Sequence, residues 1–187
     1  RWDGVSDIEL LTKIMGADPY NKELLPLELD FTKIKRALIL SPHQDDESLG
    51  VGGTMLLLRQ AQIPVEVYFT SDGGVLNPKF TDQDSEVPEI RFAEARKMAE
   101  YADVEMDILG IPDARPKPTV KHMELFAQKL WDNKDSAIFI PWLLDTPPKH
   151  RYLHHLLYLT DKHIGLPEVD LCQYQVHNSI IPSHFVD

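Results

Sequence analysis

The sequence is poor in three features that mark common classes of protein. Its one cysteine, Cys172, excludes an intrachain disulfide framework, is compatible with a reducing compartment and is best explained as a small buried apolar residue. Nineteen basic side chains against thirty acidic ones give a net charge of −11, which argues against nucleic acid or an anionic membrane surface as the main partner. No apolar run is long enough to span a membrane, and the first residues lack the pattern of a signal peptide. We therefore expect a soluble, cytoplasmic protein.

Strand and helix patterns alternate after residue 36, and 187 residues leave room for one domain with a sizeable core. Short runs rich in β-branched or aromatic residues predict strands at Ala37–Leu40, Val65–Ser71, Glu105–Leu109, Ala137–Pro141 and Val169–Val176. Apolar residues at helical spacing predict helices over Glu47–Gln60, Pro88–Tyr101, Val120–Trp131 and Arg151–His163. The alternation predicts an α/β, three-layer Rossmann-like fold, in which helices cover both faces of a mostly parallel sheet.

Two segments lie outside this alternation. Before the first strand, the pattern over Val5–Met15 predicts a short helix. After the second strand, the stretch Asp72–Val87 carries glycines, a proline and several acids without a period, which predicts a loop at the same sheet edge as the end of the first strand. A loop of that length is more often functional than idle.

The most informative segment lies where the first strand meets the following helix, and it reads SPHQDDESLGVGGT over residues 41–54. His43 and Asp46 are three residues apart on the turn, so one imidazole and one carboxylate can converge on an ion of the zinc or iron type. Asp45 is then left over as a general base beside the ion. A helix N-cap with acids in the first turn would account for one acid, but not for a histidine followed by three acids and a glycine cluster. The glycines favour a phosphate-binding turn only weakly, because they lie within the helix pattern.

A catalytic zinc usually takes three protein ligands, so a third must come from elsewhere in the chain. The favoured source is His150, in the loop expected after the fourth strand, because that loop emerges at the same edge of a parallel sheet. His154, His155 and His163 are the competing candidates, and they fall within a helix pattern.

At this point the residues resemble a known family. The run at 41–54 is similar to the signature of the PIG-L/LmbE-like deacetylases, zinc-dependent enzymes that remove an acyl group from N-acetylglucosamine-type amino sugars. Later blocks of the family resemble Thr70–Gly74, Arg91–Ala95, Leu109–Asp113 and Asp145–Arg151, the last being similar to Asp-x-His-Pro-Asp-His-Arg. The resemblance implies a single deacetylase domain over 1–187, with 1–35 as a lead-in and a C-terminus that stops short of where relatives continue.

The resemblance also implies roles for particular residues. By position, His43, Asp46 and His150 are expected to hold Zn²⁺ or another divalent ion, and Asp45 is expected to be the base. Arg91 resembles a family position that holds substrate hydroxyls or head groups, and Asp72 is a second candidate for contact with sugar hydroxyls. Arg91 could equally form a helix-surface ion pair with Glu94 or Glu100.

Two residues depart from the family pattern. Gln44 stands where the family often has proline, which loosens the turn but removes no ligand. Pro147 stands where the family commonly has a histidine that stabilises the tetrahedral intermediate, and loss of such a donor costs about a hundredfold or more in turnover. His154 or His177 must then substitute as the oxyanion donor, or the activity is weak or altered.

Two functions from different classes remain open from the sequence. The first is a metal-dependent N-deacetylase acting on an amino sugar or glycoconjugate; the second is a non-catalytic or weakly active carbohydrate- or metal-binding domain of the same fold. An intact Asp45 favours the enzyme, since a pure binding site has no need of a base. The expected partner is a small-molecule or glycoconjugate amino sugar rather than nucleic acid, and the oligomeric state is left open.

Overall fold

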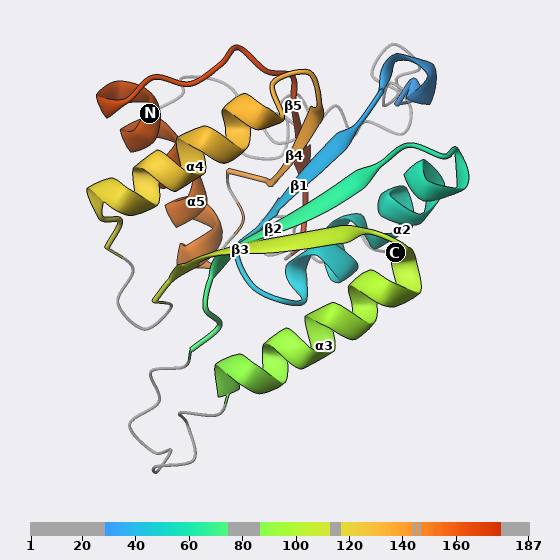
Figure 1. Cartoon of the computed structure of the whole chain (residues 1–187), viewed down its shortest axis with the longest axis horizontal. Coiled ribbons are helices and arrows are strands. Elements are labelled where there is room, and N and C mark those ends of the chain that lie inside the picture. The colour runs from blue at the N-terminus through green and yellow to red at the C-terminus, as the bar shows by residue number, and fades with distance from the viewer. Residues whose placement is uncertain (1–28, 75–86, 113–116, 144, 146, 177–187) are drawn as a thin grey trace, which may run out of the picture. The chain divides into compact units, whose positions relative to one another are not determined.

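The strands form one all-parallel sheet in the part of the chain that the computed structural model describes, which is residues 29–74, 87–112, 117–143, 145 and 147–176. Its order is β3-β2-β1-β4-β5, and every neighbouring pair runs parallel (Figure 1). The strands are β1 (Ala37–Ser41), β2 (Val65–Ser71), β3 (Glu105–Ile111), β4 (Ala137–Pro141) and β5 (Leu171–Tyr174).

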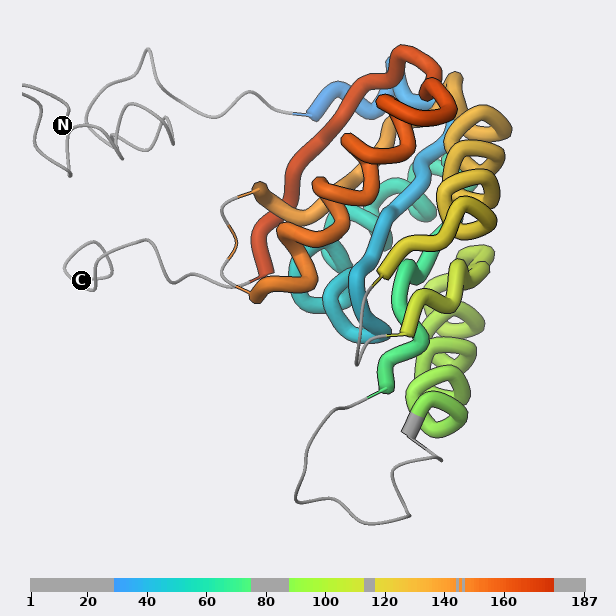
Figure 2. Tube along the Cα trace, turned by 90° about the vertical axis from the view of Figure 1, so that its left-hand side faces the viewer, coloured from blue at the N-terminus to red at the C-terminus, as the bar shows by residue number. Residues whose placement is uncertain are grey.

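Helices connect the strands and cover both faces of the sheet. They are α2 (Asp46–Gln60), α3 (Val87–Ala102), α4 (Val120–Asp132) and α5 (Pro148–His163), and a 3₁₀ turn, η2 (Phe31–Lys33), precedes β1. Helices α2 and α3 lie on one face, while α4 and α5 lie on the other (Figures 1 and 2). The predicted α/β fold with a parallel sheet and covering helices is therefore confirmed.

The order of the strands creates a switch point beside β1. The chain moves outward from β1 to β2 and β3, then crosses back through α4 to place β4 on the other side of β1. In open α/β sheets the connections after two such strands separate, and ligands bind in the crevice that opens there. His43 lies in the turn that follows β1, and His150 lies in the first turn of α5, the helix that follows β4, so the two histidines predicted as ligands lie at this switch point.

The sheet core explains how α5 is held over the strand ends. Strands β1 and β2 are buried along their whole length, as expected for parallel strands covered on both faces. On the α4–α5 face, Leu153 and Leu156 of α5 are fully buried in a cluster with residues of β1, β3, β4 and α4. The ring of Tyr68 stacks on that of Phe126 in the same layer, with centroids 6.4 Å apart.

Element boundaries differ from the sequence prediction mainly at α5. This helix begins at Pro148 rather than Arg151, so His150 lies in its first turn and not in a loop. Proline is tolerated at the first helical position because the N–H that it lacks has no intrahelical partner there. Strand β5 is shorter than the predicted 169–176, because regular pairing with β4 covers only Leu171–Tyr174.

Several predictions concern segments that lie wholly or partly outside the residues that the structure describes. The helix predicted over Val5–Met15 and most of the loop predicted over Asp72–Val87 lie outside the described residues. The lead-in 1–35 and the single-domain organisation therefore stay predictions. Cys172 is half-buried in β5 rather than fully buried, and burial raises the pKa of its thiol.

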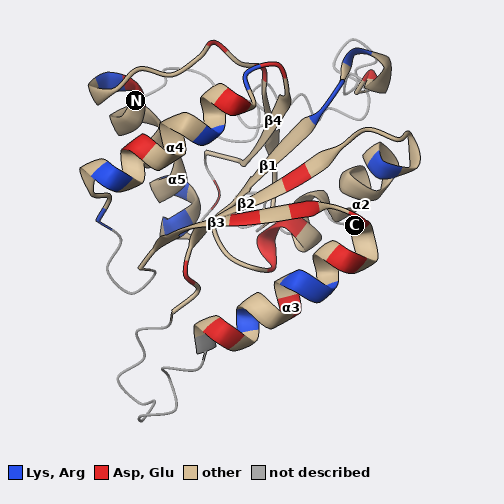
Figure 3. Cartoon of the chain, viewed as in Figure 1, with Lys and Arg blue, Asp and Glu red and all other residues tan. Residues whose placement is uncertain are grey.

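Surface charge and helix length bear on possible partners. Acidic and basic side chains are interspersed along α3 instead of forming a face of one sign (Figure 3). None of the helices in the described ranges is long and apolar enough to cross a membrane.

Candidate active site

The turn between β1 and α2 is shaped by its own polar groups. The Ser41 hydroxyl donates to the carbonyl oxygen of His43 over 2.7 Å, and the backbone N–H of His43 donates to Asp46 Oδ2 over 3.0 Å. Helix α2 then begins at Asp46. The spacing of His43 and Asp46 therefore folds both side chains to the same side of the strand end.

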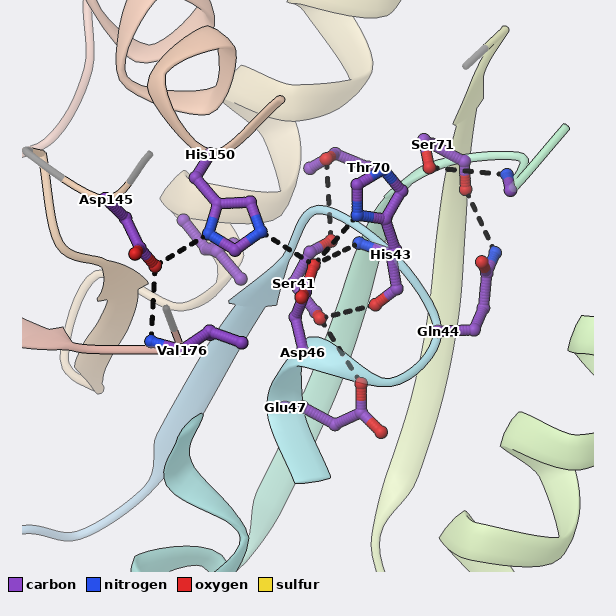
Figure 4. Close-up of polar contacts among 12 residues, drawn as sticks. Ser41, His43, Gln44, Asp46, Glu47, Thr70, Ser71, Asp145, His150 and Val176 are labelled. Atoms are coloured by element: carbon purple, nitrogen blue, oxygen red, sulfur yellow. Dashed lines mark hydrogen bonds and ion pairs between the residues drawn. The ribbon is translucent and has the colours of Figure 1, made fainter. Parts of the chain in front are cut away.

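His43, Asp46 and His150 converge at the carboxyl edge of the sheet (Figure 4). Asp46 Oδ2 lies 3.0 Å from His43 Nδ1 and 3.2 Å from His150 Nε2. The two imidazole rings have their centroids 6.1 Å apart and are tilted by 48°. One ligand atom from each residue can be chosen so that all lie within 4.8 Å of one another. The structure thus brings together the three residues that the sequence proposed as ligands.

Asp145 orients His150 from behind. Its Oδ2 lies 2.9 Å from His150 Nδ1 and accepts from the backbone N–H of Val176 over 3.2 Å. Both Asp145 and His150 are almost completely buried. A carboxylate acceptor at Nδ1 fixes the ring and leaves Nε2 facing Asp46, which is the arrangement by which outer carboxylates orient metal-binding histidines.

Electrostatics favour the charged carboxylate at the centre of this group. Burial opposes the ionisation of Asp46, but hydrogen bonds from His150 and His43 outweigh burial and hold the pKa of Asp46 well below its usual range. Burial alone would lower the pKa of His150, but the neighbouring Asp46 and Asp145 carboxylates raise it above its usual value. A buried carboxylate between two imidazoles is therefore maintained as an anion.

The donor set fits a divalent ion of the zinc type. Two imidazole nitrogens and one carboxylate oxygen are the protein ligands of one class of catalytic zinc site, which leaves a coordination position for water or substrate. The donors come from separate elements, since His43 and Asp46 follow β1 and His150 lies in the first turn of α5. The buried Asp46 carboxylate lies between the buried imidazole of His150 and the partly exposed one of His43. Such a group needs a cation or protons among its members, and a metal ion meets that need.

Asp45 occupies the N-cap position of α2 but does not act as a cap. Its carbonyl oxygen accepts from the N–H groups of Ser48 and Leu49, while its side chain makes no capping hydrogen bond. The residue is exposed, in contrast to Asp46 and Glu47 beside it. The side chain therefore does not have the capping role that competed with the functional interpretation.

Glu47 and Gln44 hold the turn in place. The buried Glu47 carboxylate accepts from the hydroxyl of Ser48, and its Oε2 lies 3.3 Å from Ser41 Oγ; burial raises the pKa of Glu47. The Gln44 side chain donates through Nε2 to the carbonyl oxygen of Ser71, which ties the turn to the end of β2. The family often has proline at this position, where the rigid ring restricts the turn. Here the hydrogen bond from Gln44 to the end of β2 holds the turn instead.

Glycine at position 73 is favoured mainly by its backbone conformation. Its φ is +72°, and a Cβ there would lie 2.4 Å from Gln44 Oε1 and 2.9 Å from Arg91 Cδ. Arg91 is half-buried on α3, and the described residues include no ion pair between Arg91 and Glu94 or Glu100. The surface ion pair considered as an alternative is therefore not formed. Asp72 uses Oδ1 to accept from the N–H of Gly74 over 2.9 Å, which stabilises its own turn.

The two histidines predicted as oxyanion donors differ in what the structure shows of them. His154 donates through Nε2 to the carbonyl oxygen of Pro141 over 2.6 Å, so in this structure it supports the end of β4. His177 lies outside the described residues. Pro147 takes the N-cap position of α5 and offers no side-chain donor.

Sequence reasoning missed two residues near the site. In the sequence, Asp145 is only the first residue of the segment similar to the family's, and its contact with His150 depends on the start of α5 at Pro148. Tyr152 carries a hydroxyl that is buried without a hydrogen-bond partner in the described part of the chain, and burial raises the pKa of this side chain to about 12. No sequence pattern signals such a group, since it is defined only by its surroundings.

Fold and site together define an α/β protein with a His–Asp–His group at the switch point of a parallel sheet. The family model for PIG-L, described as GlcNAc-PI de-N-acetylase, matches residues 38–159, and the chain belongs to this family. The match includes all three converging residues as well as Asp45. No curated protein sequence matches the chain.

Solved structures share the fold at low sequence identity. The N,N'-diacetylchitobiose deacetylase from Pyrococcus horikoshii is 22% identical with a TM-score of 0.65, over 95% of this chain and 72% of that chain. The 4-carboxy-2-hydroxymuconate hydratase GalB from Pseudomonas putida KT2440 is 20% identical with a TM-score of 0.58, over 69% and 56%. The A40926 pseudoaglycone deacetylase Dbv21 is 18% identical with a TM-score of 0.59, over 75% and 63%. The chain thus spans less than two thirds of the latter two proteins, and the shared fold accommodates more than one reaction.

The Asp145 contact leads to a prediction about metal affinity. Asp145→Asn keeps the size of the side chain but removes the charge behind His150, so we expect metal affinity to fall by about 10–100-fold, the usual cost of losing an outer partner. Competition with a chromophoric chelator measures this affinity. Asp161→Asn, an exposed change on the same helix as His150, is the control. Equal affinity in Asp145→Asn and wild type would show that this carboxylate does not support a bound ion.

Proposed function

We propose that the chain is a metal-dependent hydrolase that removes an N-acetyl group from an amino sugar or a glycoconjugate. The observation that carries this proposal is the convergence of His43, Asp46 and His150. Asp45 directly precedes Asp46 in the sequence, and its side chain makes no capping hydrogen bond. Membership of the PIG-L family supports the same reaction class. Two of the structures that share the fold are named as deacetylases, which agrees with it.

In this proposal His43, Asp46 and His150 hold the ion, and Zn²⁺ is the first candidate because of their donor atoms. When bound, such an ion polarises the acyl carbonyl as a Lewis acid and lowers the pKa of water. The chain supplies the fixed geometry. Asp145 fixes the ring of His150, and the turn hydrogen bonds of Ser41 and His43 fix the other two ligands.

Asp45 handles the protons of the reaction. A water molecule adds to the acyl carbon and gives a proton to the Asp45 carboxylate; the C–N bond then breaks and the same proton passes to the leaving nitrogen. The products are a free amine and acetate, so one carboxylate serves first as base and then as acid. An exposed carboxylate with no capping bond is suited to this exchange.

Arg91 and Asp72 are the proposed contacts for the sugar. Arg91 lies against Gly73, and Asp72 precedes that glycine, so both belong to the connection that follows β2. A guanidinium and a carboxylate together can donate to and accept from ring hydroxyls. Because Asp72 also stabilises its own turn, Arg91 is the stronger candidate of the two.

A non-catalytic or weakly active carbohydrate- or metal-binding domain is the second candidate. Pro147 favours it, because a proline offers no donor for the negative charge that develops on the acyl oxygen. The enzyme is preferred since a binding site gains nothing from the Asp45 carboxylate.

An amine-release assay tests the proposed function. The purified chain, loaded with Zn²⁺, is expected to release amine and acetate in equal amounts from at least one N-acetylated amino sugar, with N-acetylglucosamine and N,N'-diacetylchitobiose as the first probes. Removal of the ion by a chelator should abolish release, and its return should restore it. A folded, metal-loaded chain that releases neither product from any N-acetyl sugar would overturn the enzyme and favour the binding domain.

A further inference from the structure

Tyr174, the last residue of β5, reaches past β4 to β1. Strand β4 lies between the other two in the sheet, yet the Tyr174 hydroxyl donates to the carbonyl oxygen of Leu40 over 2.9 Å. In the described residues, the regular pairing of β1 with β4 ends just before Leu40, at Ile39 and Phe139. The hydroxyl therefore makes its bond where the two strands begin to separate, which is where the crevice of a switch point opens.

The backbone at the end of β5 fixes the connection that leads from β4 to α5. The carbonyl oxygen of Tyr174 accepts from the N–H of Trp142 over 2.6 Å. The N–H of Val176 donates to Asp145 Oδ2 over 3.2 Å, and the same oxygen lies 2.9 Å from His150 Nδ1 (Figure 4). The chain at the end of β5 is therefore joined to β1 on one side and, through Asp145, to His150 on the other.

Helix α2 packs against the same part of β5 at Gly50, one turn after Asp46. A Cβ on Gly50 would lie 2.5 Å from Tyr174 Cδ2 and 2.8 Å from Val176 Cγ2, which is closer than packed side chains approach one another. Residues four apart on a helix lie on the same face, so Asp46 and Gly50 share the face that β5 meets. The end of β5 therefore sets how closely the first turns of α2 can approach.

The Tyr174 side chain is a fixed part of the interior. The residue is 7% exposed, and burial raises the pKa of Tyr174 well above its usual value, so its hydroxyl stays protonated and donates. Buried tyrosine hydroxyls usually find a partner, and here the partner is the carbonyl oxygen of Leu40. This hydroxyl therefore holds β1 rather than a substrate.

We propose that the segment 174–176 sets the distance between the two parts of the candidate metal site, with Tyr174 as a positioning residue. His43 and Asp46 follow β1, whereas His150 lies in the first turn of α5. A zinc-type ion takes nitrogen and oxygen ligands at about 2.0–2.2 Å, so a small shift of one part against the other weakens the whole site. The proposal rests on the proposed function in that these three residues hold an ion.

Tyr174→Phe is the first test, because it keeps the ring against α2 but removes the donor to Leu40. We expect Co²⁺ affinity, measured by chelator competition well below the melting temperature, to fall by about tenfold, the lower end of the cost of losing an outer partner. The visible absorption of bound Co²⁺ should change as well, since it reports the coordination geometry. A purely structural contact would lower the melting temperature and leave the affinity and the spectrum of the folded chain unchanged.

Ser136→Ala controls for a loss of stability alone. Ser136 is buried just before β4, at the amino edge of the sheet, and its hydroxyl donates to Asn133 Oδ1 over 3.3 Å. This variant should melt at a lower temperature than wild type and bind Co²⁺ equally well. Wild-type affinity and spectrum in Tyr174→Phe overturn the proposal, and so does an equal loss of affinity in Ser136→Ala.

The glycines of α2 supply a second, matched test. Gly50→Ala forces the helix and the end of β5 apart, so Co²⁺ affinity should fall by at least about tenfold. Gly53→Ala makes the same change where a Cβ would meet no atom within 4 Å, so it should keep the affinity of wild type and melt at a higher temperature. Equal affinities in the two variants contradict the proposal. If Gly50→Ala does not fold, Tyr174→Phe decides.

The two proposals fail in different ways. A wild-type chain that binds Co²⁺ but releases no amine contradicts the proposed function, and the Co²⁺ affinities still decide on Tyr174. An active wild type whose Tyr174→Phe and Gly50→Ala variants bind Co²⁺ normally overturns the positioning role alone. A wild type that binds no divalent ion overturns both.

Discussion

Asp45→Asn is expected to lower the rate of amine release by about two to four orders of magnitude, which is the usual contribution of general acid–base catalysis. The amide keeps the size of the side chain but cannot take a proton from water or return it to the leaving nitrogen. Because Asp45 makes no capping hydrogen bond, the change removes no contact that stabilises α2. Metal affinity and melting temperature should therefore remain close to those of wild type.

Steady-state kinetics and chelator competition on the same preparation separate these effects. Asp135→Asn, an exposed aspartate distant in sequence from the site, controls for the loss of one negative charge from an acidic chain. A rate equal to wild type in Asp45→Asn would contradict the assignment of the base. A fall in metal affinity would instead show that Asp45 is a ligand, which the present geometry does not favour.

The fold could be predicted from the sequence because each strand is recognised from a short run of neighbouring residues. Strands β1 and β2 are short, largely apolar runs, which is the pattern expected for parallel strands that helices cover on both faces. Two of the three converging residues could be predicted for the same reason. His43 and Asp46 are three residues apart on one turn, so their meeting depends only on where β1 ends and α2 begins.

The other half of the site depends on contacts between distant segments. His150 and His154 are four residues apart on α5, and sequence spacing alone could not decide between them. The start of α5 at Pro148 and the burial of Leu153 and Leu156 against the sheet direct His150 toward Asp46. His154, one turn further on, reaches Pro141 instead.

Supporting groups were the least predictable part of the site. Asp145 matters because its carboxylate meets both His150 and the backbone of Val176, which is a consequence of how α5 and β5 pack. The unpaired hydroxyl of Tyr152 is visible only when every neighbour is known. Such groups follow from hydrogen-bond accounting in three dimensions, which a sequence pattern does not contain.

Asp46→Asn is expected to have the largest effect on metal binding. Its Oδ2 is the atom that both histidines approach, at 3.0 and 3.2 Å, and Asp46 is the one acid of the converging group. An amide is a poorer ligand and turns one N–H donor toward the site. Loss of even an outer partner costs about 10–100-fold in affinity, so loss of this ligand should exceed about 100-fold.

Thermal unfolding with and without Zn²⁺ measures this effect independently of turnover. An ion that binds only the folded state at 100 times its Kd stabilises that state by about 2.7 kcal/mol, so wild type and Asp45→Asn should both melt at higher temperature when Zn²⁺ is added. Asp46→Asn should show almost no such shift at the same concentration. Asp45→Asn is the matched control, because it makes the same chemical change at the adjacent residue. Equal shifts in both variants would contradict the role of Asp46 as a ligand, whatever the variants do to the rate of amine release.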